Sequence, residues 1–345
     1  MKLKTFLPGD VTGKKVLVRV DFNVPLADGK VADPTRICAH LPTLRALKAA
    51  GAKVALISHL GRPKGTADMK YSLKPVGEEL ANITGWDVRF VPECIGPDVE
   101  KATSDWGNEV LLLENVRFHP EEEKNSMEFA KKLAENFDLF VMDAFSAAHR
   151  AHSSTKAITE VLPSFAGLLM VKETEMLGAV RDDPKKPFVL ILGGAKVSDK
   201  IAVVENMLKK VDTILIGGGM AFTFLKAQGL NVGRSMVEQD RIAFAGELLV
   251  QAAARNIEIL LPTDIVAADS PASGGPVQTV PAEAIPEHLM GLDIGPESAE
   301  VFSKAIERSS TVFWNGPMGV FENPLFADGT RTISQSLAEA TKSGC

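Results

Sequence analysis

Cysteine is scarce in this 345-residue sequence: Cys38, Cys94 and Cys345 are its only three, and no two have the C-x-x-C spacing. An odd count without paired spacing argues against a disulfide framework or a zinc site and fits a reducing cytoplasm. Long apolar runs are also missing, because none approaches the roughly 20 residues that cross a bilayer. The N-terminus MKLKTFLPGD lacks a signal-peptide core. We expect a soluble, cytoplasmic protein without a membrane partner.

A surplus of positive charge is absent as well. The formal net charge is −6, whereas proteins that bind nucleic acid usually carry a basic surplus, so no nucleic-acid partner is expected. Neither common nucleotide fingerprint occurs, since there is no G-x-x-x-x-G-K-[ST] and no well-placed G-x-G-x-x-G. What the sequence does have is length and 45% hydrophobic residues, enough for two domains with sizeable cores.

Short β-rich runs alternate with segments of helical period in both halves of the chain. Strands apolar on both faces that alternate with helices predict parallel sheets covered on both sides. We therefore expect an α/β protein with two doubly wound parallel-sheet (Rossmann-like) domains. The expected strands are 15–20, 53–58, 87–91, 110–114 and 139–143 in the first half and 188–192, 213–216, 258–261 and 311–314 in the second. The expected helices are 37–50, 73–83, 126–136, 198–209, 221–228, 240–255 and 297–307.

A domain boundary is predicted where a helix near 172–180 is followed by the polar, proline-containing run RDDPKKP. The first domain would span 1–171, the helix and linker 172–186, and the second domain 187–345.

Cationic groups follow several strands of the first half. Arg62, Arg117 and Arg150 come after the second, fourth and fifth strands, and Arg36 opens the helix after the first. Ligands of parallel sheets bind at the carboxyl ends of strands, and the guanidinium fork pairs two oxygens of a phosphate or carboxylate. One such arginine alone is more simply a surface residue, but four together indicate a small, multiply charged anion.

The histidines and one acid at these ends are less decisive. His59 follows the second strand and could join the anion site, whereas His40, His119 and His288 are interpreted as ordinary polar histidines. Asp143 could be a catalytic base, could cap a helix, or could orient an arginine.

Glycine-rich turns end three strands of the second half: GGAKVSDK, GGGMA and WNGPMGVFE. Glycine lets the backbone approach a ligand closely, and Ser198 or Asp199 could cap the next helix. Lys196 and Lys200, four residues apart, could share one face near that helix start. The turns favour a nucleotide site, although glycine turns occur in any α/β protein.

Nine sequence segments together resemble those of a known protein family. They are RVDFNVP, TRI, SHLGRPKG, LLENVRF, DAFSAAHRAHSS, LGGAKVSDK, GGGMA, GLDIGP and WNGPMGVFE, and they cover essentially the whole chain. In sequence and order they resemble the phosphoglycerate kinase family. The resemblance implies a bilobal monomer that moves a phosphoryl group between 1,3-bisphosphoglycerate and ADP, giving 3-phosphoglycerate and ATP in glycolysis. It places phosphoglycerate in the first domain and Mg²⁺-bound ADP or ATP in the second, with the helix near 172–180 as a hinge for domain closure.

The resemblance also implies roles for individual residues. Arg36, Lys196 and Lys200 would act on the transferring group. The substrate would contact Asp21, Phe22, Asn23, Arg36, His59, Leu60, Gly61, Arg62, Arg117 and Arg150. The nucleotide would contact Gly193, Gly194, Lys200, Gly217, Gly218, Gly219, Leu292, Asn315 and Glu322. An attacking carboxylate is already ionised at neutral pH, so no general base is needed, and catalysis would consist of positioning and charge neutralisation.

The sequence departs from the family pattern at a few points. Ser146 stands where the family usually has glycine, which would strain a turn of positive φ, while Cys38 and His40 are interpreted as tolerated changes. The family normally continues past Cys345 into glycine-rich turns that hold its metal-site acid, so no metal ligand is identified in this chain. The alternative hypothesis is an impaired, shortened chain that binds phosphoglycerate only. An NAD-dependent dehydrogenase is disfavoured by the missing G-x-G-x-x-G.

Overall fold

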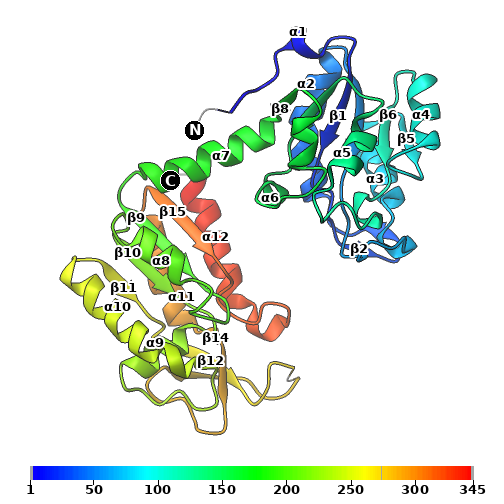
Figure 1. Cartoon of the computed structure of the whole chain (residues 1–345). Helices are drawn as coiled ribbons and strands as arrows, with labels where there is room; N and C mark the ends of the chain where they lie inside the picture. Colours follow the sequence, from blue (N-terminus) through cyan, green and yellow to red (C-terminus); the bar gives the residue numbers. More distant parts are fainter. Residues whose placement is uncertain (1–2, 273, 343–345) are drawn as a thin grey trace. The chain divides into compact units, whose positions relative to one another are not determined.

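The computed structural model describes residues 3–272 and 274–342. It forms two compact units, Met1–Gly178 and Ala179–Cys345, called here the first and second unit (Figure 1). Both contain a parallel sheet between helices, as the sequence pattern predicts.

The first unit is built on a six-stranded parallel sheet in the order β5-β6-β4-β1-β7-β8. Its strands are β1 Lys15–Arg19, β4 Lys53–Ile57, β5 Val88–Val91, β6 Val110–Leu113, β7 Leu139–Met142 and β8 Ser164–Ala166, and a two-stranded hairpin is formed by β2 Leu26–Ala27 and β3 Lys30–Val31. The five strands expected here are present with ends shifted by one residue or less. The carboxyl ends of β1, β4, β6 and β7 therefore meet along one edge.

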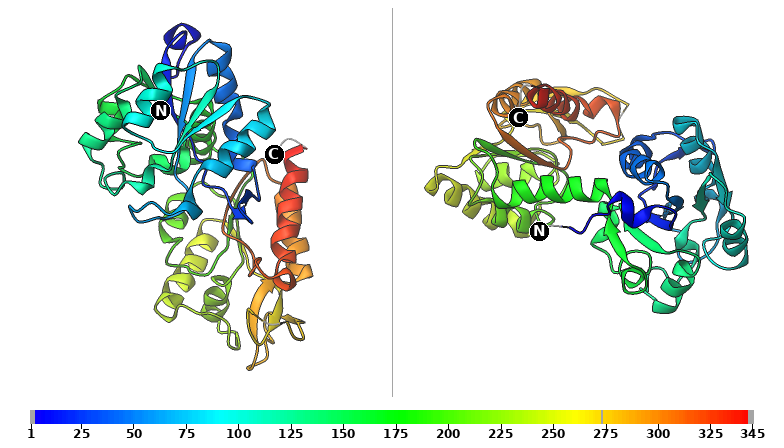
Figure 2. Two further views of the ribbon diagram at one scale, coloured as in Figure 1. Left: turned by 90° about the vertical axis from the view of Figure 1, so that its right-hand side faces the viewer. Right: turned by 90° about the horizontal axis from the view of Figure 1, so that it is seen from above.

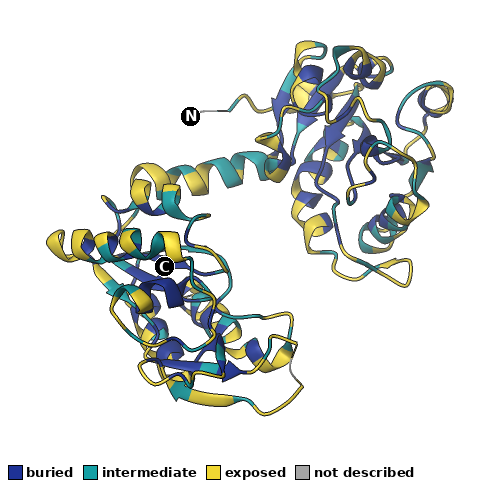
Figure 3. Cartoon of the chain, turned by 60° about the horizontal axis from the view of Figure 1, so that its bottom comes forward, coloured by how far each residue is buried: buried dark blue, intermediate teal, exposed yellow. Residues whose placement is uncertain are grey.

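Alternating side chains of the central strands supply two cores. Val16 and Val18 of β1 face one hydrophobic cluster, and Leu17 faces the other. Helices and short 3-10 turns cover both faces: α1 Pro8–Val11, α2 Thr35–Ala49, η1 Met69–Tyr71, α3 Lys74–Thr84, α4 Pro97–Ser104, η2 Val116–Phe118, α5 Met127–Ala134, α6 Phe145–Ala148, η3 Ala157–Glu160 and α7 Leu168–Asp182. Figure 3 shows the buried strands between helices that are exposed on their outer faces.

The second unit contains a four-stranded parallel sheet in the order β11-β10-β9-β15. Its strands are β9 Phe188–Leu192, β10 Thr213–Ile216, β11 Glu258–Leu260 and β15 Thr311–Asn315. The helices and 3-10 turns are α8 Ile201–Met207, α9 Ala221–Ala227, η4 Gln239–Arg241, α10 Ile242–Ala254, α11 Pro296–Glu307, η5 Pro324–Phe326 and α12 Asp328–Lys342. Helices α11 and α12 pack side by side, which is visible in the left view of Figure 2.

A second sheet in this unit was not expected from the sequence. It is antiparallel, in the order β13-β12-β14, with β12 Asp264–Ala268, β13 Gln278–Pro281 and β14 Met290–Ile294. The edge strand β13 is largely exposed, so it lacks the two-sided apolar pattern that marks the parallel strands. That exposure explains why β13 was missed, whereas β12 and β14 are mostly buried and were missed although they carry apolar residues.

The start of α8 corrects another expectation. The helix begins at Ile201 rather than Ser198, with Lys200 as its N-cap and no side-chain cap. The Ser198 hydroxyl and backbone N–H instead donate to the Glu238 carboxylate at 2.6 and 3.1 Å. Lys196 and Lys200 therefore precede the helix, and the shared helical face predicted for them does not exist.

The helix expected near 172–180 lies within α7, which begins in the first unit and ends in the second. Its role as a hinge, and the boundaries 172 and 186, remain predictions. Within the described part of the chain, no helix combines the length and apolar character needed to span a membrane.

Three glycine turns of the second unit hold one another through backbone contacts. The Gly194 N–H donates to the Pro317 carbonyl at 2.8 Å, and the Gly218 N–H donates to the Met318 carbonyl at 2.9 Å. A Cβ added at Gly218, where φ is +65°, would lie 2.6 Å from the Gly194 nitrogen. Glycine is thus required there by the packing of the turns themselves.

We expect Gly218→Ala to destabilise the protein by roughly 3 kcal/mol, about 1 from left-handed backbone and about 2 from the clash. Gly229→Ala is the matched control, since Gly229 has φ +87° but no atom within 4 Å of an added Cβ, and it should cost only about 1 kcal/mol. Urea denaturation of both variants gives the comparison, and equal losses would contradict the packing argument.

Candidate active site

The loop after β1 is fixed to the loop after β4. The Asn23 side-chain oxygen accepts a hydrogen bond from the Gly61 N–H at 2.8 Å, and the Phe22 N–H donates to the Ser58 hydroxyl at 2.8 Å. The Phe22 ring is fully buried and Leu60 is almost so, so either would reach a ligand only through its backbone. Gly61 has φ +62°, and an added Cβ would lie 2.4 Å from the Tyr71 ring.

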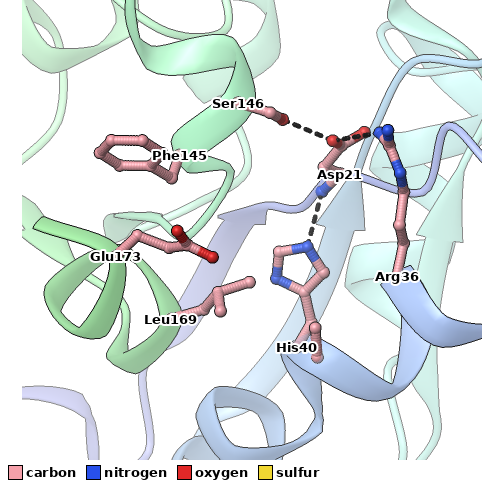
Figure 4. A pocket seen from close by; sticks show the side chains of 8 residues that line it. Asp21, Arg36, His40, Phe145, Ser146, Leu169 and Glu173 are labelled. Carbon is pink, nitrogen blue, oxygen red and sulfur yellow. Dashed lines mark hydrogen bonds and ion pairs between the residues drawn. The ribbon is translucent and has the colours of Figure 1, made fainter. Parts of the chain in front are cut away.

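Asp21 is the most highly connected residue of this loop (Figure 4). Its carboxylate accepts from the Arg36 guanidinium at 2.6 Å, from the Ser146 hydroxyl, and from the Asn23 N–H at 3.2 Å. Its own N–H donates to His40 Nε2 at 2.9 Å. A cavity of about 250 Å³ lies at this point. It is lined by Asp21, Arg36, Ala39, His40, Phe145, Ser146, Leu169 and Glu173.

The structure decides between the alternatives for Asp143. This fully buried carboxylate accepts from His40 Nδ1 at 2.7 Å and from the N–H groups of Leu169 and Met170 at 3.0 and 3.4 Å. It therefore caps the first turn of α7 and orients a histidine rather than an arginine. His40 is a buried polar histidine with both ring nitrogens bonded, which agrees with its interpretation.

Ser146 is not strained, contrary to the expectation from the family pattern. It lies in the short helix α6 and is not among the residues of positive φ. Helical backbone accepts any side chain without the penalty of a left-handed turn.

Three of the four predicted arginines, Arg62, Arg117 and Arg150, come together in the first unit, whereas Arg36 bonds Asp21. Burial lowers the pKa of the Arg117 guanidinium, and charge repulsion from Arg150 and Arg62 lowers it further, because these two arginines lie near Arg117. Arg117 is 5% exposed and donates to the Gly61 carbonyl at 2.9 Å, with its Nε 3.2 Å from a Glu123 carboxylate oxygen. Arg62 is exposed.

His59 lies among these arginines but contributes no charge. Burial, followed by repulsion from Arg19, Arg117, Arg150 and His152, lowers the pKa of the His59 imidazole to about 2. Its Nδ1 is 3.0 Å from Arg19 Nη2 and must accept that hydrogen bond. The proton of the neutral ring therefore sits on Nε2, which makes His59 a neutral hydrogen-bond donor.

Arg19 is the member of the site that sequence analysis missed. Its guanidinium is buried at the end of β1 and donates to Ser154 Oγ at 2.9 Å and to the Val20 carbonyl at 2.6 Å. Burial lowers the pKa of Arg19, and the fully buried Glu122 opposes that shift. Glu122 accepts from the Ser154 hydroxyl at 2.5 Å. The sequence offered one signal for this residue, because Arg19 is the last residue of a strand and directly follows a run of apolar residues.

A second pocket, of about 320 Å³, lies in the second unit at the glycine turns. It is lined by Gly194, Ala195, Gly218, Gly219, Met236, Pro271, Met290, Gly291, Leu292, Pro317, Gly319, Val320 and Glu322. Of the residues expected at a nucleotide, Gly194, Gly218, Gly219, Leu292 and Glu322 line it. The apolar walls and single acid suit a flat base and sugar.

The other expected nucleotide residues lie outside this lining. Gly193 and Gly217 are buried behind it, where their N–H groups donate to the Asn315 and Leu192 carbonyls at 3.0 and 2.8 Å. The Lys200 ammonium donates to Asn315 Oδ1 at 2.6 Å, and Lys196 is exposed.

One group among the described residues has a metal-ligating composition: Glu93, Cys94 and His119 in the first unit. Their ligand atoms all lie within 4.8 Å of one another. The His119 imidazole already bonds the Glu93 carboxylate at 2.7 Å. We interpret the group as an ion pair beside a buried thiol.

One α/β unit carries an arginine cluster at its sheet edge and the other a glycine-lined pocket, which is the arrangement of a phosphotransferase with an anionic substrate and a nucleotide. The family model described as phosphoglycerate kinase matches residues 7–345. The chain belongs to the phosphoglycerate kinase family.

Relatives agree with this assignment. A phosphoglycerate kinase of Pelotomaculum thermopropionicum is 51% identical, covering 98% of this chain and 86% of the relative. The cytosolic phosphoglycerate kinase of Triticum aestivum is 54% identical (97% and 84%), and the chloroplastic one of Volvox carteri is 53% identical (97% and 73%). The crystal structure of phosphoglycerate kinase from Pyrococcus horikoshii matches with a TM-score of 0.83 at 32% identity, covering 95% of this chain and 84% of that one.

The comparisons confirm the predicted family, fold class and phosphotransferase activity. They give no support to the alternatives of a chain that only binds phosphoglycerate or of a dehydrogenase.

The depressed His59 pKa predicts how stability depends on pH. Unfolded histidine takes up a proton near pH 6.5, but folded His59 does so only near pH 2, so acid favours the unfolded state between these values. From pH 6.5 to 5 this single group should lower the unfolding free energy by roughly 2 kcal/mol.

Urea denaturation at both pH values checks this, with His59→Gln as the comparison because it keeps a polar side chain that does not titrate. The variant should lose roughly 2 kcal/mol less unfolding free energy than the wild type over this interval. An identical loss in both proteins would show that folded His59 titrates normally.

Proposed function

We propose that this chain catalyses reversible phosphoryl transfer from 1,3-bisphosphoglycerate to ADP, giving 3-phosphoglycerate and ATP, as a step of glycolysis in the cytoplasm. The observation that carries the proposal is the gathering of Arg117 and Arg150 around a neutral His59, with Arg62 near Arg117, at the carboxyl edge of the first sheet. Such a cluster fits a phosphate group on a small acid.

In the first unit we assign the phosphate of the substrate to these arginines and to the His59 Nε2 donor. Asp21 and Asn23 lie on the adjoining loop, where a carboxylate and an amide can bond the hydroxyl group of a glycerate. Arg36 lies beyond Asp21, with its guanidinium half exposed. It is therefore assigned to the carboxyl end, where the phosphoryl group is transferred.

In the second unit we assign the adenosine to the 320 Å³ pocket, with Glu322 as the acceptor for ribose hydroxyls. Lys200 and Lys196 stand at the loop before α8 and are assigned to the nucleotide phosphates and the transferring group. Mg²⁺ enters as part of the nucleotide substrate. Chelating Mg²⁺ should stop turnover and leave 3-phosphoglycerate binding intact.

These residues need only position the substrates and neutralise charge. The carboxylate of 3-phosphoglycerate is ionised at neutral pH and attacks without a base. The transferring phosphoryl carries negative charge, which the Arg36 and Lys200 cations would neutralise. Because the acyl phosphate and the nucleotide are assigned to different units, transfer requires closure of the units, with α7 as the hinge, in a monomeric protein. Closure would also keep water from the phosphoryl donor.

A coupled assay tests the proposal. The protein is mixed with Mg-ATP and 3-phosphoglycerate, and 1,3-bisphosphoglycerate is followed by a dehydrogenase that consumes NADH. Steady turnover is expected. A folded sample that neither turns over nor binds 3-phosphoglycerate would overturn the proposal.

Arg36→Ala should lower kcat by at least about hundredfold, because a cation that acts on the transferring phosphoryl is lost. The KM for 3-phosphoglycerate should change by less than about threefold, since the phosphate arginines remain. Steady-state kinetics of both parameters provide the measurement.

The matched control is Arg45→Ala, which removes an exposed arginine from the same helix, α2, and should leave both parameters unchanged. If Arg36→Ala instead raises KM as much as it lowers kcat, Arg36 binds the ground state and its catalytic assignment is wrong.

A further inference from the structure

Two side chains interpreted from the sequence as tolerated or strained changes, His40 and Ser146, both contact Asp21. His40 Nε2 accepts the Asp21 N–H at 2.9 Å, and the Ser146 hydroxyl donates to the Asp21 carboxylate (Figure 4). They reach Asp21 from different elements, α2 and α6. Neither contact belongs to the phosphate cluster.

The hydrogen bonds of His40 continue beyond Asp21. Because Nε2 accepts, the proton of the neutral ring lies on Nδ1, which donates to Asp143 Oδ2 at 2.7 Å. The other Asp143 oxygen accepts the Leu169 N–H at 3.0 Å. An unbroken chain of three hydrogen bonds thus joins the Asp21 backbone to the first turn of α7.

Every inner member of this chain is shielded from water. His40 is 1% exposed and Asp143 is fully buried, and the Phe22 ring packs edge-on against the imidazole with centroids 5.7 Å apart. A buried polar group that loses its partner cannot turn to solvent, so the bonds hold the geometry of both ends. A displacement of the Asp21 backbone should therefore move His40 and change the hydrogen bond between His40 and Asp143.

We propose that His40 is a positioning residue that holds Asp21 in place for phosphoglycerate and connects it to the first turn of α7. Ser146, in α6, fixes the Asp21 carboxylate through its hydroxyl. This inference rests on the proposed function, because it takes Asp21 as a substrate contact. A ligand hydroxyl at Asp21 and a ligand charge drawing Arg36 away would both change the bonds that Asp21 now makes.

The test compares amide hydrogen exchange at Leu169 and Met170 with and without saturating 3-phosphoglycerate, after calorimetry has given the affinity. In the wild type, 3-phosphoglycerate should slow exchange at these amides severalfold. In His40→Ala the ligand-dependent slowing should be lost, and the KM for 3-phosphoglycerate should rise about tenfold with a smaller change in kcat.

Thr43→Val is the matched control. Thr43 Oγ1 accepts the Leu168 N–H at 2.9 Å, so this variant also weakens the start of α7, but it leaves the chain through His40 intact. Basal exchange should rise while the response to 3-phosphoglycerate persists. Ser146→Gly, at an exposed position, should raise KM by a few fold and keep the response.

The outcomes separate the two hypotheses. Wild-type protein that binds 3-phosphoglycerate without any change at Leu169 and Met170 overturns the positioning inference alone, whether or not His40→Ala folds. Retention of the full response in a folded His40→Ala protein does the same. Failure of the wild type to bind 3-phosphoglycerate at all overturns the proposed function and this inference together.

Discussion

The anion site depends on one buried charge, the Arg19 guanidinium at the end of β1. Removing a cation from water is costly unless an anion and hydrogen bonds compensate it. Glu122, itself buried, supplies the anion and meets Arg19 through the shared Ser154 hydroxyl. A compensated pair adds little net charge, so Arg62, Arg117 and Arg150 remain the source of positive potential.

Arg19 also determines the state of His59. Its donated hydrogen bond fixes the tautomer, and its charge helps to keep the ring neutral. The cluster thereby gains a directional donor without adding a further cation among arginines that already repel one another. The pocket of the second unit is shaped differently, by glycine turns that approach one another so closely that a Cβ at Gly218 would clash with Gly194.

Much of the fold could be predicted because parallel strands are apolar on both faces and stand between helices. The ends of β9 and β10 match the expectation without any shift. Strand β13 could not be predicted from that pattern, because it is exposed and carries no buried periodicity, whereas β12 and β14 are mostly buried and were overlooked. The early start expected for α8 was wrong because Ser198 bonds Glu238, which is 40 residues away in sequence.

The residue types of the site could be predicted from the sequence, but the contacts between them could not. Arginines at strand ends indicated an anion, and Arg62, Arg117 and Arg150 do converge. What sequence could not reveal was which groups are buried: Arg19 beneath the cluster, and His40 between Asp21 and Asp143. Both depend on contacts between residues far apart in the chain, which local pattern does not encode.

The arginine cluster of the first unit is assigned to a phosphate group on a small acid. The decisive experiment is a calorimetric titration with 3-phosphoglycerate and with glycerate, in the absence of nucleotide. We expect 3-phosphoglycerate to bind and glycerate to bind at least about a hundredfold more weakly, since the charge-assisted hydrogen bonds to the phosphate are lost. Equal affinity for the two compounds, or no heat from either, would contradict this assignment.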